Sequence, residues 1–314
     1  MPSQWDLARA RLSGSSSKTI KLARRVARPV RRRVASWSNP STRRFALTVP
    51  VEEGFRELTV EAPWSGYIAR ELARTGLGGY EHDSLAALLA GADLAGDGAI
   101  FDIGANIGVF ALLAGASTSR RVIAFEPMPG LAATARAAVE SNGLREVTVE
   151  QVALAATAGS ATFYASAVSD ASNSLNPAHR AHSHSFEVVL ETLDGYVLRT
   201  GLVPVMIKID TETTEPDVIR GGLGTLARER PWVICEVLGS GRPDELADLM
   251  APLGYHYYRI SSEPRWIAAD RPRPITEGKF FNWLFAPEPL DEAFWERLDL
   301  WRGRLAACGS RTLP

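Results

Sequence analysis

The hydrophobic and polar positions of residues 99–286 predict an alternation of buried strands and helices. Short apolar runs suit strands that are covered on both faces, and the segments between them carry apolar residues three or four positions apart, as helices do. We therefore expect an α/β domain with a mainly parallel seven-stranded sheet flanked by helices. The expected strands are 100–103, 121–125, 147–153, 161–164, 186–191, 205–210, 232–237, 255–260 and 280–285, and the expected helices 109–114, 131–140, 194–198, 215–228 and 243–253.

The residues before this alternation predict a small N-terminal addition. Alternating runs at 45–49 and 57–61 suit a hairpin, and two helices are expected at 67–73 and at 85–90, the second stopped by Gly91. We divide the chain into a basic extension, a hairpin with a helix, the α/β domain, and a C-terminal helix and tail. The four parts span residues 1–44, 45–78, 79–287 and 288–314.

Composition indicates a globular intracellular protein. The chain has 314 residues, of which 46% are hydrophobic and 23% charged, as in globular chains with a full core. No apolar run approaches the roughly 18 residues that span a bilayer, and the polar, basic start does not have the pattern of a signal peptide. With only two cysteines, a disulfide framework is excluded, and we expect a cytoplasmic location.

Charge is distributed unevenly along the chain. Residues 1–50 contain twelve lysines and arginines and one acid. Between residues 18 and 37, apolar positions three and four apart predict a basic amphipathic helix, which Pro29 interrupts. Such a segment either stays a solvated extension or attaches peripherally to an anionic surface, such as the inner face of a membrane. A nucleic-acid partner is not expected.

The first strand of the domain leads into a loop that suits a nucleoside ligand. Asp102 ends the strand, and Gly104 and Gly108 follow with the spacing G-x-x-x-G. Glycine allows close approach of a ligand to the main chain. The next strand ends at Glu126, and an acid at that position can accept both hydroxyls of a ribose.

The loop favours S-adenosylmethionine over a dinucleotide. A dinucleotide fold has G-x-G-x-x-G, so that the pyrophosphate can bind at the helix N-terminus. Here Asn106 lies in the middle of the loop, and the Asp102 carboxylate would repel a phosphate while suiting the ammonium of an amino acid. Taken alone, the loop also fits an ordinary strand-to-helix turn that binds no cofactor, and this alternative stays open. Glu81 is a further candidate to close over the amino-acid tail.

Several of these segments together resemble the FkbM family of S-adenosylmethionine-dependent methyltransferases. The matching segments occur in the family's order and cover about residues 79–287: Asp102–Gly108, Val122–Pro127, Ser141–Leu144, Ser174–Leu175, Ile207–Glu212 with Val218–Gly222, and Phe281–Phe285. The resemblance implies O-methylation of a hydroxyl on a sugar, a glycan or a polyketide-type product. It also implies that Asp210 and Glu212 lie near the reacting centre. The family usually has glycine where this chain has Thr213.

The chemistry requires alignment of the acceptor and a group that takes its proton. Asp210 is the best-placed base, and Lys208 and Glu212 are further catalytic candidates. Alternatively, Asp210, Glu212 and Glu236 hold a divalent cation such as Mg²⁺, which would lower the pKa of the alcohol. The expected cofactor contacts are Glu81, Asp102, Gly104, Asn106, Gly108, Glu126, Pro127, Ala153 and Asp210.

The polar insert at residues 166–185 is the expected substrate loop. Asn173, Ser174 and His184 are its candidate substrate contacts, and the histidines at 179, 182 and 184 lack the regular spacing of metal ligands. The sequence therefore predicts a hydroxyl-directed O-methyltransferase. The alternatives are a nicotinamide-dependent oxidoreductase and a non-catalytic protein of the same fold that docks to a membrane or polyanion.

Overall fold

The computed structural model describes residues 41–166, 169–179, 181–274 and 281–314. Residues 42–314 form one compact unit. Among the described residues, no helix is both long and apolar enough to cross a membrane. The amphipathic helix expected at residues 18–37 lies outside the described residues, so its attachment to an anionic surface stays a prediction.

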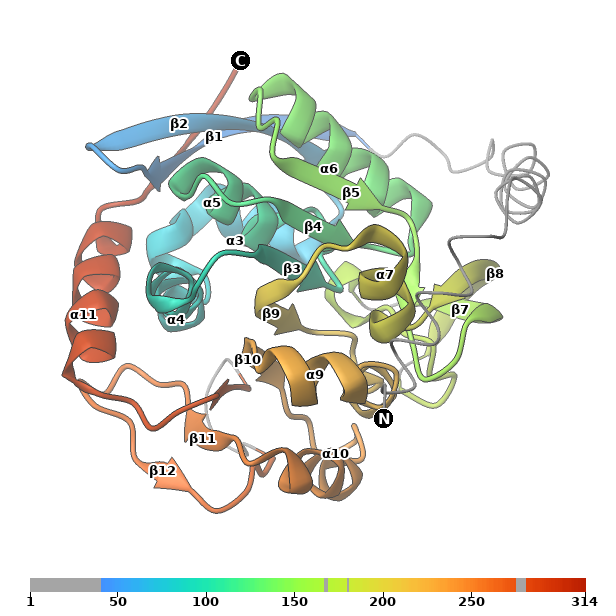
Figure 1. Cartoon of the computed structure of the whole chain (residues 1–314). Coiled ribbons are helices and arrows are strands. Elements are labelled where there is room, and N and C mark those ends of the chain that lie inside the picture. Colours follow the sequence, from blue (N-terminus) through green and yellow to red (C-terminus); the bar gives the residue numbers. More distant parts are fainter. Residues whose placement is uncertain (1–40, 167–168, 180, 275–280) are drawn as a thin grey trace. The chain divides into compact units, whose positions relative to one another are not determined.

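A mixed sheet of eight strands forms the centre of the α/β fold (Figure 1). The strand order is β12-β11-β13-β10-β9-β3-β4-β5. The five strands from β10 to β5 are parallel, and β13, β11 and β12 are antiparallel. The sheet is therefore less parallel than we expected, and the short β12 makes it one strand wider. The bounds are Ala99–Ile103 (β3), Val122–Phe125 (β4), Val147–Glu150 (β5), Pro204–Ile209 (β9), Trp232–Glu236 (β10), His256–Arg259 (β11), Ala268–Ala269 (β12) and Asn282–Ala286 (β13).

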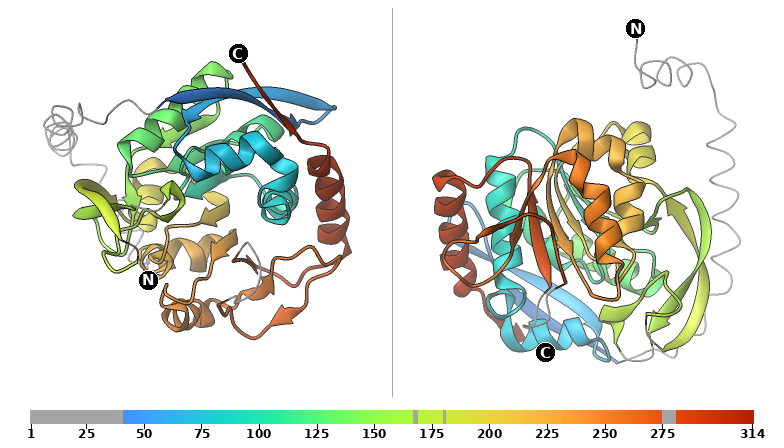
Figure 2. Two further views of the ribbon diagram at one scale, coloured as in Figure 1. Left: turned by 180° about the vertical axis from the view of Figure 1, so that it is seen from behind. Right: turned by 90° about the horizontal axis from the view of Figure 1, so that it is seen from below.

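Helices cover both faces of this sheet, and each face has its own hydrophobic core (Figures 1 and 2). Successive side chains of a strand point to opposite faces, so Ile100 packs with one group of helices and Phe101 with the other. The first group is α4 (His82–Leu94), α5 (Val109–Ser117) and α6 (Pro129–Ser141), and the second is α7 (Leu193–Thr200), α8 (Glu215–Arg220), α9 (Leu223–Glu229) and α10 (Pro243–Met250). Burial on both faces explains the nearly continuous apolar runs of the strands.

Two helix predictions were wrong because of glycines that pack closely. Helix α4 continues through Gly91, where a Cβ would lie 3.2 Å from the sulfur of Met206, instead of stopping there. The helix expected at 215–228 is divided into α8 and α9 at Gly221 and Gly222. A Cβ on Gly221 would lie 2.1 Å from the carbonyl oxygen of Ala155, so the close approach of that segment requires glycine where the two helices meet.

The expected third strand is also divided. Residues 147–150 pair in the main sheet as β5, whereas β6 (Ala153–Leu154) joins a second sheet of order β6-β8-β7. The other strands of that sheet are β7 (Gly159–Ser166) and β8 (His182–Glu191). Strand β8 takes up the last part of the segment that we expected to be a polar insert.

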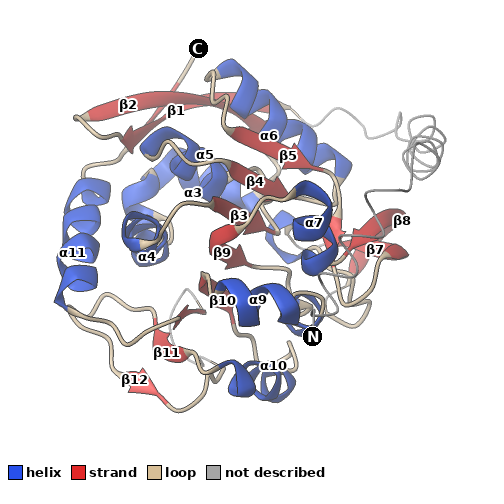
Figure 3. Cartoon of the chain, viewed as in Figure 1, coloured by secondary structure: helices blue, strands red, loops and turns tan. Residues whose placement is uncertain are grey.

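The N-terminal hairpin forms as predicted, from β1 (Thr42–Pro50) and β2 (Phe55–Pro63). Figure 3 shows it across one end of the fold, with the β7–β8 hairpin projecting from the side. The C-terminal strand β14 (Ser310–Thr312), which was not predicted, adds to β1. Helix α3 (Tyr67–Thr75) follows the hairpin, and the C-terminal α11 (Glu292–Ala306) packs against α4.

Candidate active site

One cavity lies where the parallel strands end, the edge at which open α/β sheets bind ligands. Acidic side chains at the tips of β4, β9 and β10 reach it together. Twelve of the site residues expected from the sequence line it: Glu81, Asp102, Gly104, Asn106, Glu126, Pro127, Ala153, Asn173, Lys208, Asp210, Glu212 and Glu236. The strand tips therefore bring into one cavity residues that lie far apart in the sequence.

The loop after β3 requires an unusual backbone. Gly104 has φ of +84°, and a Cβ there would lie 1.7 Å from the carbonyl oxygen of Asp210. Asn106 is also left-handed, with φ of +52°, a conformation that asparagine tolerates better than most residues. The turn aims the amide of Asn106 at the next strand tip.

Glu126 at the tip of β4 is held by main-chain amides on both carboxylate oxygens. Asn106 N donates to Oε2 and Met128 N donates to Oε1, each at 2.8 Å. Only 5% of the residue is exposed, and burial raises the pKa of Glu126 to about 7 even though the two amides oppose the shift. Hydrogen-bond donors from a ligand would restore the charged form.

A second group of buried acids surrounds one lysine. Asp102 accepts a hydrogen bond from Ala111 N at 3.0 Å, and burial raises the pKa of Asp102 to about 7. Burial likewise raises the pKa of Glu81, whose Oε2 accepts from Asn282 Nδ2 at 2.7 Å. Burial lowers the pKa of Lys208, but the nearby carboxylates outweigh it and hold that pKa above its usual value.

Three further carboxyl groups meet beside this lysine. Asp210, Glu212 and Glu236 each place an oxygen within 4.8 Å of the others. Lys208 Nζ lies 2.9 Å from Oδ2 of Asp210. Burial, followed by Asp210 and Glu212, raises the pKa of Glu236 well above its usual value, and among the described residues no partner meets its Oε2. Among the described residues, the lining thus holds six acids and one cationic side chain, Lys208.

The comparison with protein families identifies this arrangement. Residues 102–257 match the family model described as the methyltransferase FkbM domain. The chain carries an FkbM-family methyltransferase domain. The resemblance read from the sequence motifs is thereby confirmed.

Several solved structures resemble the FkbM domain at low identity. An FkbM methyltransferase from Methylobacillus flagellatus KT is 16% identical with a TM-score of 0.38, over 64% of this chain and 47% of that one, about half its length. A precorrin-6y C5,15-methyltransferase from Geobacter metallireducens GS-15 is 11% identical with a TM-score of 0.36, over 64% and 84%. A putative O-methyltransferase from Klebsiella pneumoniae is 12% identical with a TM-score of 0.36, over 66% of this chain and 79% of that one. No curated protein matches the chain.

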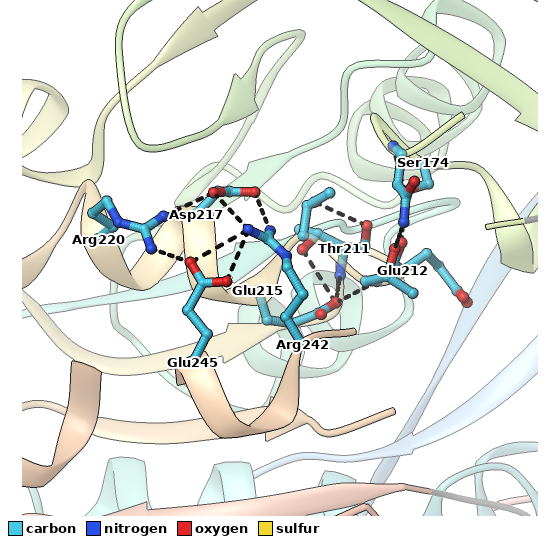
Figure 4. A network of polar contacts seen from close by, with 11 residues as sticks. Ser174, Thr211, Glu212, Glu215, Asp217, Arg220, Arg242 and Glu245 are labelled. Carbon is cyan, nitrogen blue, oxygen red and sulfur yellow. Dashed lines mark hydrogen bonds and ion pairs between the residues drawn. The ribbon is translucent and has the colours of Figure 1, made fainter. Parts of the chain in front are cut away.

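The loop after β9 in the FkbM domain is folded around Glu215 (Figure 4). Its Oε1 accepts from Thr211 N at 2.9 Å, from Thr211 Oγ1 at 3.2 Å and from Thr213 N at 3.2 Å. Glu212 and Thr213 are both left-handed, with φ of +55° and +83°. The second angle explains the family's usual glycine, because a β-branched residue rarely adopts it.

An ion-pair network beside this loop fixes the helix that follows it (Figure 4). Asp217 of α8 pairs with Arg220 and Arg242, and both arginines reach Glu245 of α10. None of these four side chains lines the cavity. The network therefore supports the position of α8 and leaves the chemistry to the loop.

Three expected site residues do not line the cavity. Gly108, with φ of +85°, begins α5 and lets it pack on α6, where a Cβ would lie 3.2 Å from that of Ala135. Ser174 is buried and donates from Oγ to the carbonyl of Glu212 at 2.6 Å. His184 is exposed on β8.

Sequence reasoning assigned no site role to many of the lining residues, and two of these bear on the chemistry of the cavity. Asn282 is 3% exposed and donates from Nδ2 to Glu81 and to Ser84, while its Oδ1 has no partner among the described residues. Its signal was a polar residue inside the apolar run 280–285, and Asn282 begins β13. Leu175 was noted as part of a family motif, but its place at the cavity was not inferred.

Proposed function

We propose that this FkbM domain transfers a methyl group from S-adenosylmethionine to a hydroxyl of a sugar, a glycan or a polyketide-type product. The observation that carries the proposal is Glu126, a buried carboxylate that two amides hold toward a cavity it shares with Asp210. We name the part of the cavity at Gly104, Asn106 and Glu126 the cofactor end. The part at Asp210, Glu212 and Glu236 is named the acceptor end.

The residues of the cavity fit S-adenosylmethionine. Glu126 suits the two ribose hydroxyls. Two main-chain amides fix the orientation of its carboxylate, and each oxygen can accept a second hydrogen bond from the cavity. Glu81 and Asp102 suit the ammonium of the amino-acid tail, and the unpartnered Oδ1 of Asn282 offers it a further acceptor. Among the described lining residues the one cation is Lys208, which already pairs with Asp210, so the pyrophosphate of a nicotinamide dinucleotide would find no positive charge to neutralise it there. This lack of cations argues against the oxidoreductase alternative.

When bound, the cofactor supplies a methyl group that is already activated on a sulfonium. The protein then has to align the acceptor and accept one proton. Asp210 is the proposed base, because its side chain is 28% exposed at the acceptor end and the buried Lys208 fixes its position. With the cofactor bound, Asp210 would take the proton of the acceptor hydroxyl while the hydroxyl oxygen forms its bond to the methyl carbon. The bond between that carbon and the sulfonium sulfur would break at the same time and leave its electron pair on the sulfur.

A divalent cation is the second way in which the hydroxyl could be activated. The oxygens of Asp210, Glu212 and Glu236 suit Mg²⁺, and the unpartnered Oε2 of Glu236 fits a ligand role. Against it, the ammonium of Lys208 already pairs with Asp210 at 2.9 Å. The side-chain base is therefore the first proposal, and the cation is a separate outcome of the same experiment.

Transfer of an isotopically labelled methyl group tests the proposal. The full chain is incubated with labelled S-adenosylmethionine and a panel of glycans and polyketide-type alcohols, and mass spectrometry locates the label. The proposal requires a labelled ether on at least one hydroxyl, unaffected by a chelator. If a chelator abolishes transfer and Mg²⁺ restores it, the cation acts. A label found only on a carboxyl or nitrogen contradicts the proposal.

A further inference from the structure

The insert after β7 contains a short segment, residues 173–176, that lies beside the acceptor end. Ser174 pairs with Tyr164 of β7 through two main-chain hydrogen bonds, of 3.1 and 2.9 Å. Asn173 has extended backbone angles, and the chain bends at Leu175. The contacts of the side chains show that alternate residues of the segment have different surroundings.

The even positions of the segment fasten it to the loop after β9. Ser174 Oγ donates to the carbonyl oxygen of Glu212 at 2.6 Å, and Asn176 Nδ2 donates to Thr213 Oγ1 at 3.0 Å. His179, a little further along, places Nε2 2.9 Å from Oε2 of Glu212. Three side chains of the insert thus contact two consecutive residues of the loop.

The odd positions face the cavity. Asn173 and Leu175 both line it, near Ala171 of the same insert. Asn173 is itself held in place, because its Oδ1 accepts from Ser166 N at 2.9 Å and its Nδ2 lies 3.2 Å from the sulfur of Met128. The segment therefore has one fastened side and one side that a ligand can reach.

The hydroxyl of Thr213 attaches residues 173–176 to the loop after β9. With φ of +83°, the position favours glycine, yet Thr213 is only 1% exposed and uses its hydroxyl to hold Asn176. Glycine would relieve the backbone but offers no hydroxyl. In this chain the left-handed threonine joins the insert to the residue that follows Glu212.

We propose that residues 173–176 form the acceptor-recognition wall of the cavity. Asn173 and Leu175 contact the acceptor. Ser174, Asn176 and Thr213 are positioning residues, because their hydrogen bonds hold this wall at a fixed place beside Glu212. The inference rests on the proposed function and adds the class of acceptor. A polar amide and an apolar side chain beside carboxyl groups fit a neutral ring that carries hydroxyls and has an apolar face, such as a hexose.

Matched substitutions of Thr213 test the fastening. Thr213→Val keeps the shape and removes the hydroxyl, whereas Thr213→Ser keeps the hydroxyl. With an acceptor from the labelling panel, we expect Thr213→Val to lower kcat about fivefold to tenfold, the effect of one lost hydrogen bond. Thr213→Ser should retain most of the activity, and Kd for S-adenosylmethionine should stay within about twofold in both. Adding Asn176→Ala to Thr213→Val should cost little more, because the two residues share one hydrogen bond.

The wall itself is tested by Leu175→Ala, which should raise KM for the acceptor more than it changes kcat. Equal losses in Thr213→Val and Thr213→Ser, or none in either, would overturn the fastening. An acceptor KM that Leu175→Ala leaves unchanged would overturn the wall.

A readout without an acceptor separates this inference from the proposed function. In the cofactor-bound chain, the amides of Tyr164 and Ser174 should exchange with deuterium about tenfold faster in Thr213→Val than in Thr213→Ser, because their pairing depends on the fastened segment. Equal exchange in the two variants overturns the fastening even if methyl transfer is established. If the wild-type chain methylates no hydroxyl, the proposed function fails, and the acceptor wall fails with it.

Discussion

The cofactor end and the acceptor end of the cavity are built from different kinds of contact. At the cofactor end, main-chain amides of the short loops after β3 and β4 hold Glu126, and the strand tips fix where those loops begin. At the acceptor end, the carboxyl of Asp210 meets a buried lysine, and the loop of Glu212 and Thr213 is fastened by side chains of a distant insert. A ligand shared by a whole family suits the first construction. An acceptor that differs between members suits the second, since loops change more readily than strand tips.

The largest predicted effect separates chemistry from cofactor binding. Asp210→Asn removes the proposed base, so kcat should fall about 10²–10⁴-fold, the usual contribution of general-base catalysis. Cofactor affinity should change little, because Glu126 is intact. Steady-state kinetics and calorimetry on the same preparation measure both, with Asp248→Asn on the exposed face of α10 as the control. A kcat within threefold of the wild type would move the base elsewhere.

The second prediction concerns pH and the cofactor end. Because burial raises the pKa of Glu126 to about 7, protonation below that pH removes the charge that ribose hydroxyls would bind. Affinity for S-adenosylmethionine should therefore fall as pH decreases from 7.5 to 5.5, approaching tenfold per pH unit. Calorimetric titrations across this range measure it, and Glu126→Gln should have a flatter profile. Affinity that rises toward low pH would reverse the assigned role.

The smallest predicted effect is on the stability of the acceptor end. Thr213→Gly removes the strain of the left-handed backbone, which costs about 1–2 kcal/mol for a residue with a side chain. It also loses a hydrogen bond that contributes about 0.5–1.5 kcal/mol. Glycine also makes the unfolded chain more flexible, which opposes the relief. The free energy of unfolding should therefore change by less than about 1 kcal/mol, as measured by urea denaturation. A loss of several kcal/mol would mean that the threonine supports the core.

The same difference explains what could be predicted from the sequence. Glu126 and Asp102 were identified because strand, loop and helix follow one another within a few residues, and the hydrophobic pattern locates the strand tip. Asn176 meets Thr213 across 37 residues, and Asn282 meets Glu81 across 201. Such contacts depend on how the whole chain packs, so local patterns do not contain them.

The errors in the fold have a similar cause. The divisions at residues 150–153 and at Gly221 arise where the backbone meets a neighbouring segment, such as the carbonyl of Ala155. The hydrophobic periodicity of a segment predicts whether it is a helix or a strand. Contacts with neighbouring segments, which the periodicity does not contain, accompany the places where these elements end. Thr213 is the instructive exception. The family usually has glycine at that position, which left the backbone there open, and the structure gives Thr213 a φ of +83°.

The central claim is that the cofactor end binds S-adenosylmethionine through Glu126. Calorimetric titration of the full chain with S-adenosylmethionine and with NAD, in the wild type and in Glu126→Ala, tests it most directly. We predict that the wild type binds S-adenosylmethionine and not NAD. In folded Glu126→Ala, binding should weaken by about 1.5–3 kcal/mol, the range for hydrogen bonds to a charged group, while exposed Glu140→Ala on α6 binds as the wild type does. Equal affinity in Glu126→Ala and the wild type, or binding of NAD alone, would contradict the account.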